Sequence, residues 1–164
     1  LLDPGRVESA DSEAEGLGLL PVTTTFFPVK STYQIRATVM TGKGLLERAS
    51  GLSLSGYEIH MGQTGGAETP APFRIDERSR KVCQDFDGCL NADGNVLGTY
   101  LHGLFHNEAF RRSILCELAA RKGVAFHATG KILSKEEQYD RLADLIRNSL
   151  DMEFIYRTMG VNRD

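Results

Sequence analysis

The chain has 164 residues, of which 41% are hydrophobic and 25% charged, so one ordinary globular domain with a buried core is expected. A net charge of −3 gives no electrostatic reason to expect a nucleic acid or an anionic membrane as a partner. No apolar run approaches the roughly 20 residues that cross a bilayer, and the first residues lack a signal-peptide pattern. The three cysteines include no CxxC pair, which argues against a disulfide framework and predicts a reducing, cytoplasmic setting.

The first part of the chain has the composition of strands and loops. Residues 1–16 are acidic and aperiodic, which predicts a loop or a weakly ordered segment. The extended segments that we predict after it are rich in β-branched and aromatic residues or alternate in polarity: 18–26, 33–39, 54–60, 73–75 and 95–101. Glycine and proline predict a loop over 62–72.

The last third changes to a helical period. We predict three helices: one from an Asn107 cap to about Lys122, a second from the 134–137 capping box, and a third from an Asp151 cap to Gly160. The residues expected to face inward are Phe110, Ile114, Leu115 and Leu118 on the first helix, and Leu142, Ile146 and Leu150 on the second. This order predicts a mixed α and β chain and leaves the strand order open.

The segment 98–105, GTYLHGLF, places a histidine, His102, at the end of a predicted strand. Gly103 follows directly, and it allows the chain to leave sharply or a ligand to approach closely. Loops after strand ends are where rigid scaffolds hold reactive groups, and an imidazole can act as a general base and then as a general acid. His102 is therefore our candidate catalytic residue; the alternative is a hydrogen-bonded structural histidine.

A second candidate is the segment 56–62, GYEIHMG. In a strand, period 2 places Tyr57, Ile59 and Met61 on one face and Glu58 and His60 on the other. A carboxylate and an imidazole on one face can orient one another or line a polar cleft. The alternative is an ordinary solvated strand face.

Metal and thiol chemistry find little support in the sequence. His102 and His106 are four residues apart, a spacing that shares a metal only on a helix, and Gly103 and the preceding strand disfavour a helix there. We expect no metal. The cysteines lack the small neighbours of a nucleophile elbow, which predicts small apolar core residues or bystanders: Cys83, Cys89 and Cys116. A phosphate-binding GxxxxGK[ST] loop is absent from the sequence.

In this order, these residues resemble the carboxy-terminal half of the glutamine amidotransferase domain of the cobyric acid synthase family. The resemblance covers nearly the whole chain and rests most on YEIHMG and GTYLHGLF; further matching segments are 3–9, 16–22, 139–144 and 155–156. It implies an α/β, flavodoxin-like class I amidotransferase sheet with flanking helices, truncated at its amino-terminal side. Residues 1–164 would be the carboxy-terminal portion of that one domain.

The resemblance also implies a reaction. In this family a cysteine thiolate attacks the side-chain amide of glutamine, giving a glutamyl thioester and ammonia, while a histidine, here His102, accepts and returns protons. The ammonia then meets carboxylates of adenosylcobyrinic acid a,c-diamide that ATP activates in a separate amino-terminal domain. ATP and Mg²⁺ are expected in that domain and no cofactor in this chain. The implied partners are glutamine and, through that domain, a corrinoid of cobalamin biosynthesis.

Two departures from the family pattern matter. The nucleophile elbow lies just before Asp3 in the family, so the cysteine is expected upstream of Leu1, and the chain alone is expected to be inactive. Many class I amidotransferases carry Glu two residues after the histidine, where this chain has Leu104. We therefore consider Glu58 as a substitute that orients His102, with His60 and Tyr57 as possible neighbours of the glutamine site. His106 stands where relatives often have Asp.

Several alternatives remain open at this point. Within the same chemistry they are cobyrinic acid a,c-diamide synthase and an amidotransferase acting on a cell-wall lipid precursor. Outside it they are a non-catalytic scaffold or binding domain of the same fold and a metal-dependent hydrolase. An open sheet edge also predicts marginal stability or pairing of two copies through that edge.

Overall fold

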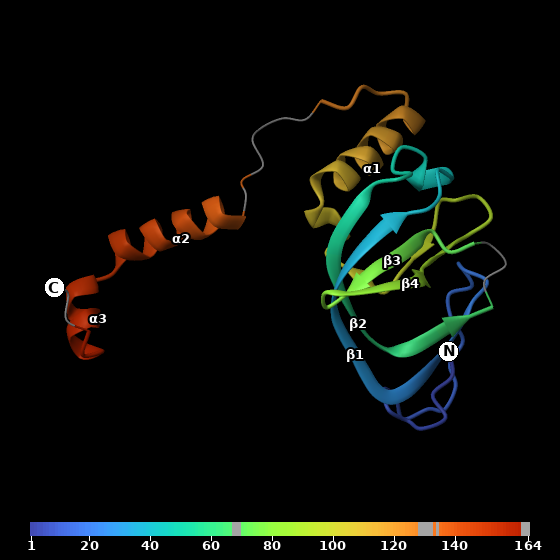
Figure 1. The fold of residues 1–164 in the computed structure, drawn as a ribbon, viewed down its shortest axis with the longest axis horizontal. Coiled ribbons are helices and arrows are strands. Elements are labelled where there is room, and N and C mark those ends of the chain that lie inside the picture. Colours follow the sequence, from blue (N-terminus) through green and yellow to red (C-terminus); the bar gives the residue numbers. More distant parts are fainter. Residues whose placement is uncertain (67–69, 128–132, 134, 162–164) are drawn as a thin grey trace. The chain divides into compact units, whose positions relative to one another are not determined.

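A computed structural model describes residues 1–161 except 67–69, 128–132 and 134. The chain divides into two compact units, Leu1–Phe126 and His127–Asp164. The first unit holds a five-stranded antiparallel sheet in the order β4-β3-β1-β2-β7 (Figure 1). Its strands are β1 (Thr23–Val39), β2 (Ser53–Gly65), β3 (Phe73–Arg78), β4 (Lys81–Asp87) and β7 (Leu101–His102). A two-stranded sheet pairs β5 (Cys89–Leu90) with β6 (Leu97–Gly98).

The longest strand, β1, covers one of the two extended segments predicted before residue 40 and the end of the other. The residues before Thr23 form bends rather than a strand. Between Phe26 and Ser31 the pairing of β1 with β2 shifts register. Pro28 lies in this shifted stretch, and proline cannot donate a ladder hydrogen bond, so the irregularity falls where the ladder would lose a donor anyway. The loop predicted over 62–72 begins later, because β2 continues to Gly65.

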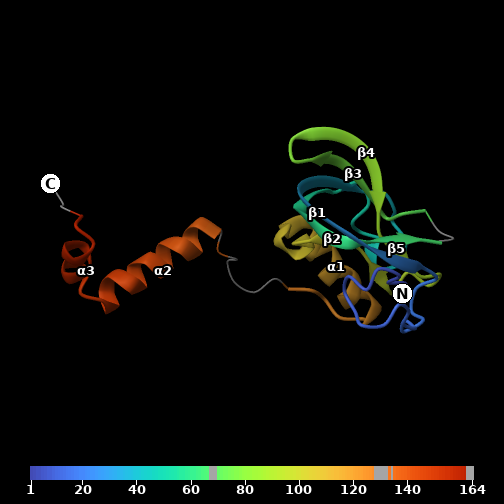
Figure 2. The same ribbon diagram turned by 90° about the horizontal axis from the view of Figure 1, so that it is seen from below.

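A hairpin of β3 and β4 forms one edge of the sheet, and Figure 2 shows its strong curvature. The sequence analysis did not predict β4, because most of its side chains are exposed and they do not alternate clearly in polarity. Ser79 and Arg80 connect the strands with φ values of 46° and 68°. Positive φ at two consecutive residues is the geometry of a type I′ hairpin turn, usually signalled by glycine or asparagine. The turn was therefore hidden from a reading of residue types.

One helix of the first unit, α1 (Glu108–Arg121), packs on the core beside the short turns η1 (Gly44–Leu46) and η2 (Leu104–His106). Its Phe110 ring lies 6.4 Å from that of Phe73, centroid to centroid. The buried face consists of Phe110, Ser113, Ile114 and Glu117. Leu115 and Leu118, predicted to face inward, are 39% and 40% exposed, so that part of the prediction is wrong. Glu117 lies on the buried face instead, where it pairs with Arg48 and Arg121.

The second unit holds α2 (Lys135–Ser149) and α3 (Met152–Thr158). The Asp151 cap is confirmed, since its Oδ1 accepts a hydrogen bond from the backbone N–H of Phe154 at 2.9 Å. Ser134, the first residue of the predicted capping box, lies outside the described residues. Three residues that we expected to face inward are exposed: Leu142, Ile146 and Leu150. Within their own unit, that prediction is wrong.

The predicted mixed α and β chain, with a sheet and a flanking helix, is confirmed. Every described strand pair is antiparallel, apart from an isolated parallel bridge between Leu2 and Thr25. Within the described part of the chain, no helix has the length and apolar character needed to cross a bilayer.

Candidate functional site

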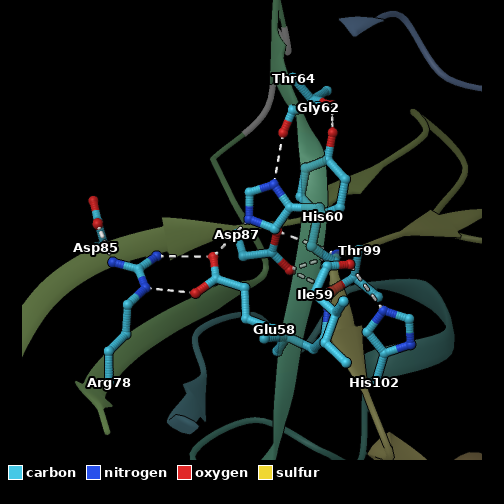
Figure 3. Close-up of polar contacts among 12 residues, drawn as sticks. Glu58, Ile59, His60, Gly62, Thr64, Arg78, Asp85, Asp87, Thr99 and His102 are labelled. Carbon is cyan, nitrogen blue, oxygen red and sulfur yellow. Dashed lines mark hydrogen bonds and ion pairs between the residues drawn. The ribbon is translucent and has the colours of Figure 1, made fainter. Parts of the chain in front are cut away.

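His102 ends β7, the short strand at the edge of the sheet. It pairs in register with Tyr57 of β2, and its side chain is exposed to solvent. The ring nitrogen Nε2 lies 3.2 Å from the backbone carbonyl oxygen of Ile59 (Figure 3). A carbonyl oxygen can only accept a hydrogen bond, so Nε2 carries the proton in this arrangement. Nδ1 then holds the lone pair and can accept a proton from another group.

Glu58 lies on the opposite face of β2 from His102, because directly paired residues share a face and Glu58 pairs with Leu101. It is 4% exposed. Arg78 holds both carboxylate oxygens, with Nε 2.5 Å from Oε2 and one terminal nitrogen 3.0 Å from Oε1 (Figure 3). The other terminal nitrogen of Arg78 donates to Asp85. Burial raises the pKa of Glu58, but hydrogen bonds from Arg78 and His60 outweigh it and leave that pKa below its ordinary value.

His60 also bonds to the buried Glu58, and the prediction that the two residues share a face is confirmed. Its Nε2 lies 3.1 Å from Glu58 Oε1 and its Nδ1 lies 2.7 Å from the carbonyl oxygen of Gly62. The imidazole stacks on the Tyr100 ring with 4.1 Å between centroids and 19° between planes. Both ring nitrogens and one ring face of His60 are therefore engaged within the chain.

A cavity of about 860 Å³ adjoins the face of β2 that carries Glu58. Its polar lining includes Thr64, Asp87 and Tyr100, and these groups bond to one another or to neighbours. The Thr64 hydroxyl lies 2.7 Å from that of Tyr100, while Asp87 accepts from the Thr99 hydroxyl and from the Tyr100 backbone N–H. Burial, with the nearby charge of Glu58, raises the pKa of Asp87 despite these bonds.

The structure therefore separates two groups that the sequence analysis had joined. Glu58 was considered as the residue that orients His102, and this is corrected: its carboxylate is held by Arg78 and His60 on the other face of the strand. The partner of His102 is the Ile59 carbonyl, a backbone group that no residue type could signal. Tyr57 does lie on the His102 side and is 43% exposed. Arg78 was missed because the predicted extended segment ended at residue 75, whereas β3 continues to Arg78. Its side chain reaches Glu58 across β1, which lies between β3 and β2 in the sheet.

The remaining candidates can be placed as well. His106 is exposed and follows the left-handed Gly103, whose φ is 80°. Among the described residues, no cluster of three or more histidine, cysteine, aspartate or glutamate side chains could hold a metal ion. All three cysteines are free. Cys89 is buried and Cys83 packs against the core, which confirms the prediction that these two are small apolar fillers.

Comparisons with known proteins identify relatives of this chain. A family model described as a CobB/CobQ-like glutamine amidotransferase domain matches residues 1–110, a stretch that contains both β2 and His102. Proteins named cobyric acid synthase are similar along nearly the whole chain. One from Dehalococcoides mccartyi is 42% identical over 160 residues, or 98% of this chain and 32% of the relative. Those from Thermoanaerobacter sp. and Sorangium cellulosum are 39% and 41% identical, covering 99% and 98% of this chain and 33% of each relative. The chain thus spans about a third of the length of these curated relatives.

Proposed function

This chain belongs to the CobB/CobQ-like glutamine amidotransferase domain family, and from that premise we propose that it is the histidine-bearing part of the amidotransferase of a cobyric acid synthase. That enzyme would release ammonia from glutamine for the ATP-dependent amidation of adenosylcobyrinic acid a,c-diamide in cobalamin biosynthesis. The observation that carries the proposal is the exposed His102 ring, held through Nε2 by the Ile59 carbonyl at the edge of the sheet.

The geometry supports a definite division of labour in glutamine hydrolysis. A cysteine thiol gives its proton to Nδ1 of His102, and the thiolate attacks the side-chain amide carbonyl of glutamine. The imidazolium returns that proton to the leaving nitrogen, which departs as ammonia and leaves a glutamyl thioester. Water, deprotonated by His102, then hydrolyses the thioester to glutamate, and the thiol is restored. Throughout, the hydrogen bond from Nε2 to Ile59 holds the ring in the tautomer that makes Nδ1 the base.

The nucleophile belongs to chain outside these 164 residues in this proposal. Cys89 is 4% exposed and Cys83 donates its S–H to the Ile75 carbonyl, so neither is presented to a substrate. Cys116 lies within α1. We place the thiol in a glycine-rich elbow preceding Leu1. ATP and Mg²⁺ act in an amino-terminal synthetase domain, where the corrinoid also binds. A cytoplasmic location belongs to the same proposal, and the free thiols are compatible with it.

The test uses the longer protein with the cysteine elbow and the synthetase domain in place. We expect this protein to release glutamate from glutamine, and we expect the 164-residue chain alone to release none. With ATP and Mg²⁺, the longer protein is then supplied with adenosylcobyrinic acid a,c-diamide, cobyrinic acid or a cell-wall lipid precursor in parallel. Amidation of the a,c-diamide supports the proposal. Amidation of another acceptor alone would contradict the assignment to cobyric acid synthase, and no glutamate from the longer protein would contradict the amidotransferase itself.

Association of two copies through a sheet edge stays a prediction. The sheet ends in β4 on one side and in the two-residue β7 on the other, so part of the β2 edge has no strand beside it among the described residues. Sedimentation of the 164-residue chain over a range of concentrations tests this directly. A stable monomer at high concentration would contradict it.

A further inference from the structure

The outer edge of β2 is completed by side chains as well as by a strand. Residues 55, 57 and 59 alternate along β2, so their peptide groups face the same edge. β7 has only two residues, and its pairing with β2 is confined to Tyr57 and Glu58. Beyond one end of this short ladder, the Ile59 carbonyl accepts a hydrogen bond from the His102 ring. Beyond the other end, the side chain of Asn107 bonds to the backbone of Ser55.

The carboxamide of Asn107 reproduces the bonding of a strand residue. Its Oδ1 accepts from the Ser55 backbone N–H at 2.9 Å, and its Nδ2 donates to the Ser55 carbonyl oxygen at 2.9 Å. Two antiparallel residues exchange the same pair of bonds when they face one another in a ladder. Nδ2 also lies 3.0 Å from the carbonyl oxygen of Leu104 and 3.3 Å from that of Gly103. Asn107 therefore joins β2 to the turn that directly follows His102.

The ordinary explanation for an asparagine before a helix does not apply here. Asn107 stands at the N-cap position of α1, but its side chain makes no hydrogen bond to an N–H of the helix. Its own carbonyl accepts from Arg111 and so begins the helix through the backbone alone. The side chain bonds instead to Ser55 at the edge of β2 and to Leu104 in the turn after β7. These bonds therefore act on the register of β7 against β2.

We propose that Asn107 is a positioning residue for His102: its carboxamide extends the β2–β7 ladder by one pair and so fixes the register that brings His102 Nε2 to the Ile59 carbonyl. A ladder of two residue pairs has little to oppose slippage, and a slip of one residue would turn His102 to the other face of the sheet. The backbones of β2 and β7 also approach closely here, since a Cβ on Gly56 would lie 2.4 Å from the His102 carbonyl oxygen. The inference relies on the proposed function only for the statement that His102 is catalytic.

The first experiment needs no activity. Nitrogen-15 spectra of the imidazoles in the 164-residue chain report which ring nitrogen of His102 carries the proton. We expect the Nε2–H tautomer in the unchanged chain and a mixture of tautomers in Asn107→Ala. Asn107→Asp should show the same loss, because a carboxylate keeps the shape but cannot donate to the carbonyl groups of Ser55, Leu104 and Gly103. The matched control is Asn91→Ala: the Asn91 carboxamide also bonds to the backbone, accepting from the N–H groups of Asn95 and Val96, but in the turn between β5 and β6.

A second measurement keeps the inference testable if the variants fold poorly. In the unchanged chain, the amide hydrogen of Ser55 should exchange with solvent at least about tenfold more slowly than in an unstructured peptide, because Asn107 accepts it. Exchange at the unstructured rate would overturn the inference. So would an unchanged His102 tautomer in folded Asn107→Ala and Asn107→Asp.

Activity of the longer protein separates this inference from the proposed function. A small misplacement of His102 should lower kcat for glutamine hydrolysis on the order of 100-fold and leave KM nearly unchanged, and Asn91→Ala should change neither. An active protein in which Asn107→Ala behaves like Asn91→Ala would overturn the positioning role. A tautomer change in a protein without glutaminase activity would instead overturn the proposed function and leave the positioning role in place.

Discussion

The two faces of β2 hold two histidines in opposite circumstances. His60, on the buried face, has Nδ1 against the Gly62 carbonyl, Nε2 against Glu58, and a ring stacked on Tyr100. His102, on the exposed face, is held by Nε2 at the Ile59 carbonyl. A ring whose two nitrogens are both committed has no lone pair to offer a substrate, whereas a ring held at one nitrogen keeps the other for proton transfer. The less completely bonded histidine is therefore the better candidate for chemistry.

The charged groups differ between the faces in the same way. On the buried face, Arg78 joins the buried Glu58 to Asp85, whose side chain is 62% exposed. The hydrogen bonds from Arg78 and His60 outweigh the desolvation of the Glu58 carboxylate. On the exposed face, the polar contact of His102 is made with the backbone, and the neighbouring Tyr57 is 43% exposed. This contrast predicts that changes on the buried face alter stability, while changes on the exposed face alter catalysis.

Replacing His102 is the strongest way to test that contrast. His102→Ala in the longer protein should lower kcat for glutamine hydrolysis by about 10³-fold, because it removes the general base and acid. The free energy of unfolding should change by less than about 0.5 kcal/mol, since the side chain is exposed. His106→Ala is the control, because His106 is also exposed and lies four residues further along. Equal losses of activity in the two variants would contradict the assignment of His102.

Removing the cation of the buried face should have the reverse effect. Arg78→Met leaves the Glu58 carboxylate, whose side chain is 6% exposed, with His60 alone, and should lower the free energy of unfolding by about 3 kcal/mol. The folded fraction should keep its glutaminase kcat. Chemical denaturation and glutamate assays measure both quantities.

Arg74→Met provides the matched control for Arg78→Met. Arg74 pairs with Asp76 on the same strand, but both side chains are about one-third exposed, so less than about 1 kcal/mol should be lost. Similar losses in the two variants would show that burial of Glu58 does not govern the strength of its ion pair.

Gly56→Ala should affect both faces at once. The added Cβ would lie 2.4 Å from the His102 carbonyl oxygen, so β7 must move away from β2. Overpacking of this kind costs about 1–3 kcal/mol of unfolding free energy, and it should lower kcat as His102 moves. Gly65→Ala is the control in the same strand, because a Cβ there has no neighbour within 4 Å. A fully active and stable Gly56→Ala variant would show that β7 can move away from β2 without cost to stability or activity, contrary to this prediction.

Acid should weaken the buried face in a predictable direction. The pKa of Glu58 is lowered below its ordinary 4.5 in the folded chain, so its stabilisation is present above pH 4.5 and is lost as pH falls through the lowered value. The stability difference between the chain and Glu58→Gln should therefore shrink below about pH 4.5. Asp87 has a raised pKa, so relative to Asp87→Asn the chain should lose stability as pH rises above 3.8. Urea denaturation between pH 3 and 7 measures both slopes, and slopes of the same sign would contradict this assignment.

Local patterns foretold much of the molecule because they depend on nearby residues alone. Period 2 placed Glu58 and His60 on one face, the residues around His102 indicated a histidine at a strand end, and Asp151 was correctly identified as a helix cap. The same kind of reasoning missed β4, whose turn residues carry positive φ without glycine or asparagine. It also misjudged the inner face of α1. A polarity pattern assigns the charged Glu117 to the surface, but its ion pairs with Arg48 and Arg121 stabilise it in a buried position.

By itself, the sequence determined the family, the histidine at the strand end, and the face that Glu58 shares with His60 two residues away. Only the tertiary structure decided which groups these side chains meet across the sheet. Strand register places His102 opposite Tyr57 rather than beside Glu58, and the short length of β7 leaves the Ile59 carbonyl to the imidazole and Ser55 to Asn107. The reason is that register and edge contacts join residues more than 40 positions apart, where no local spacing relates one residue to the other.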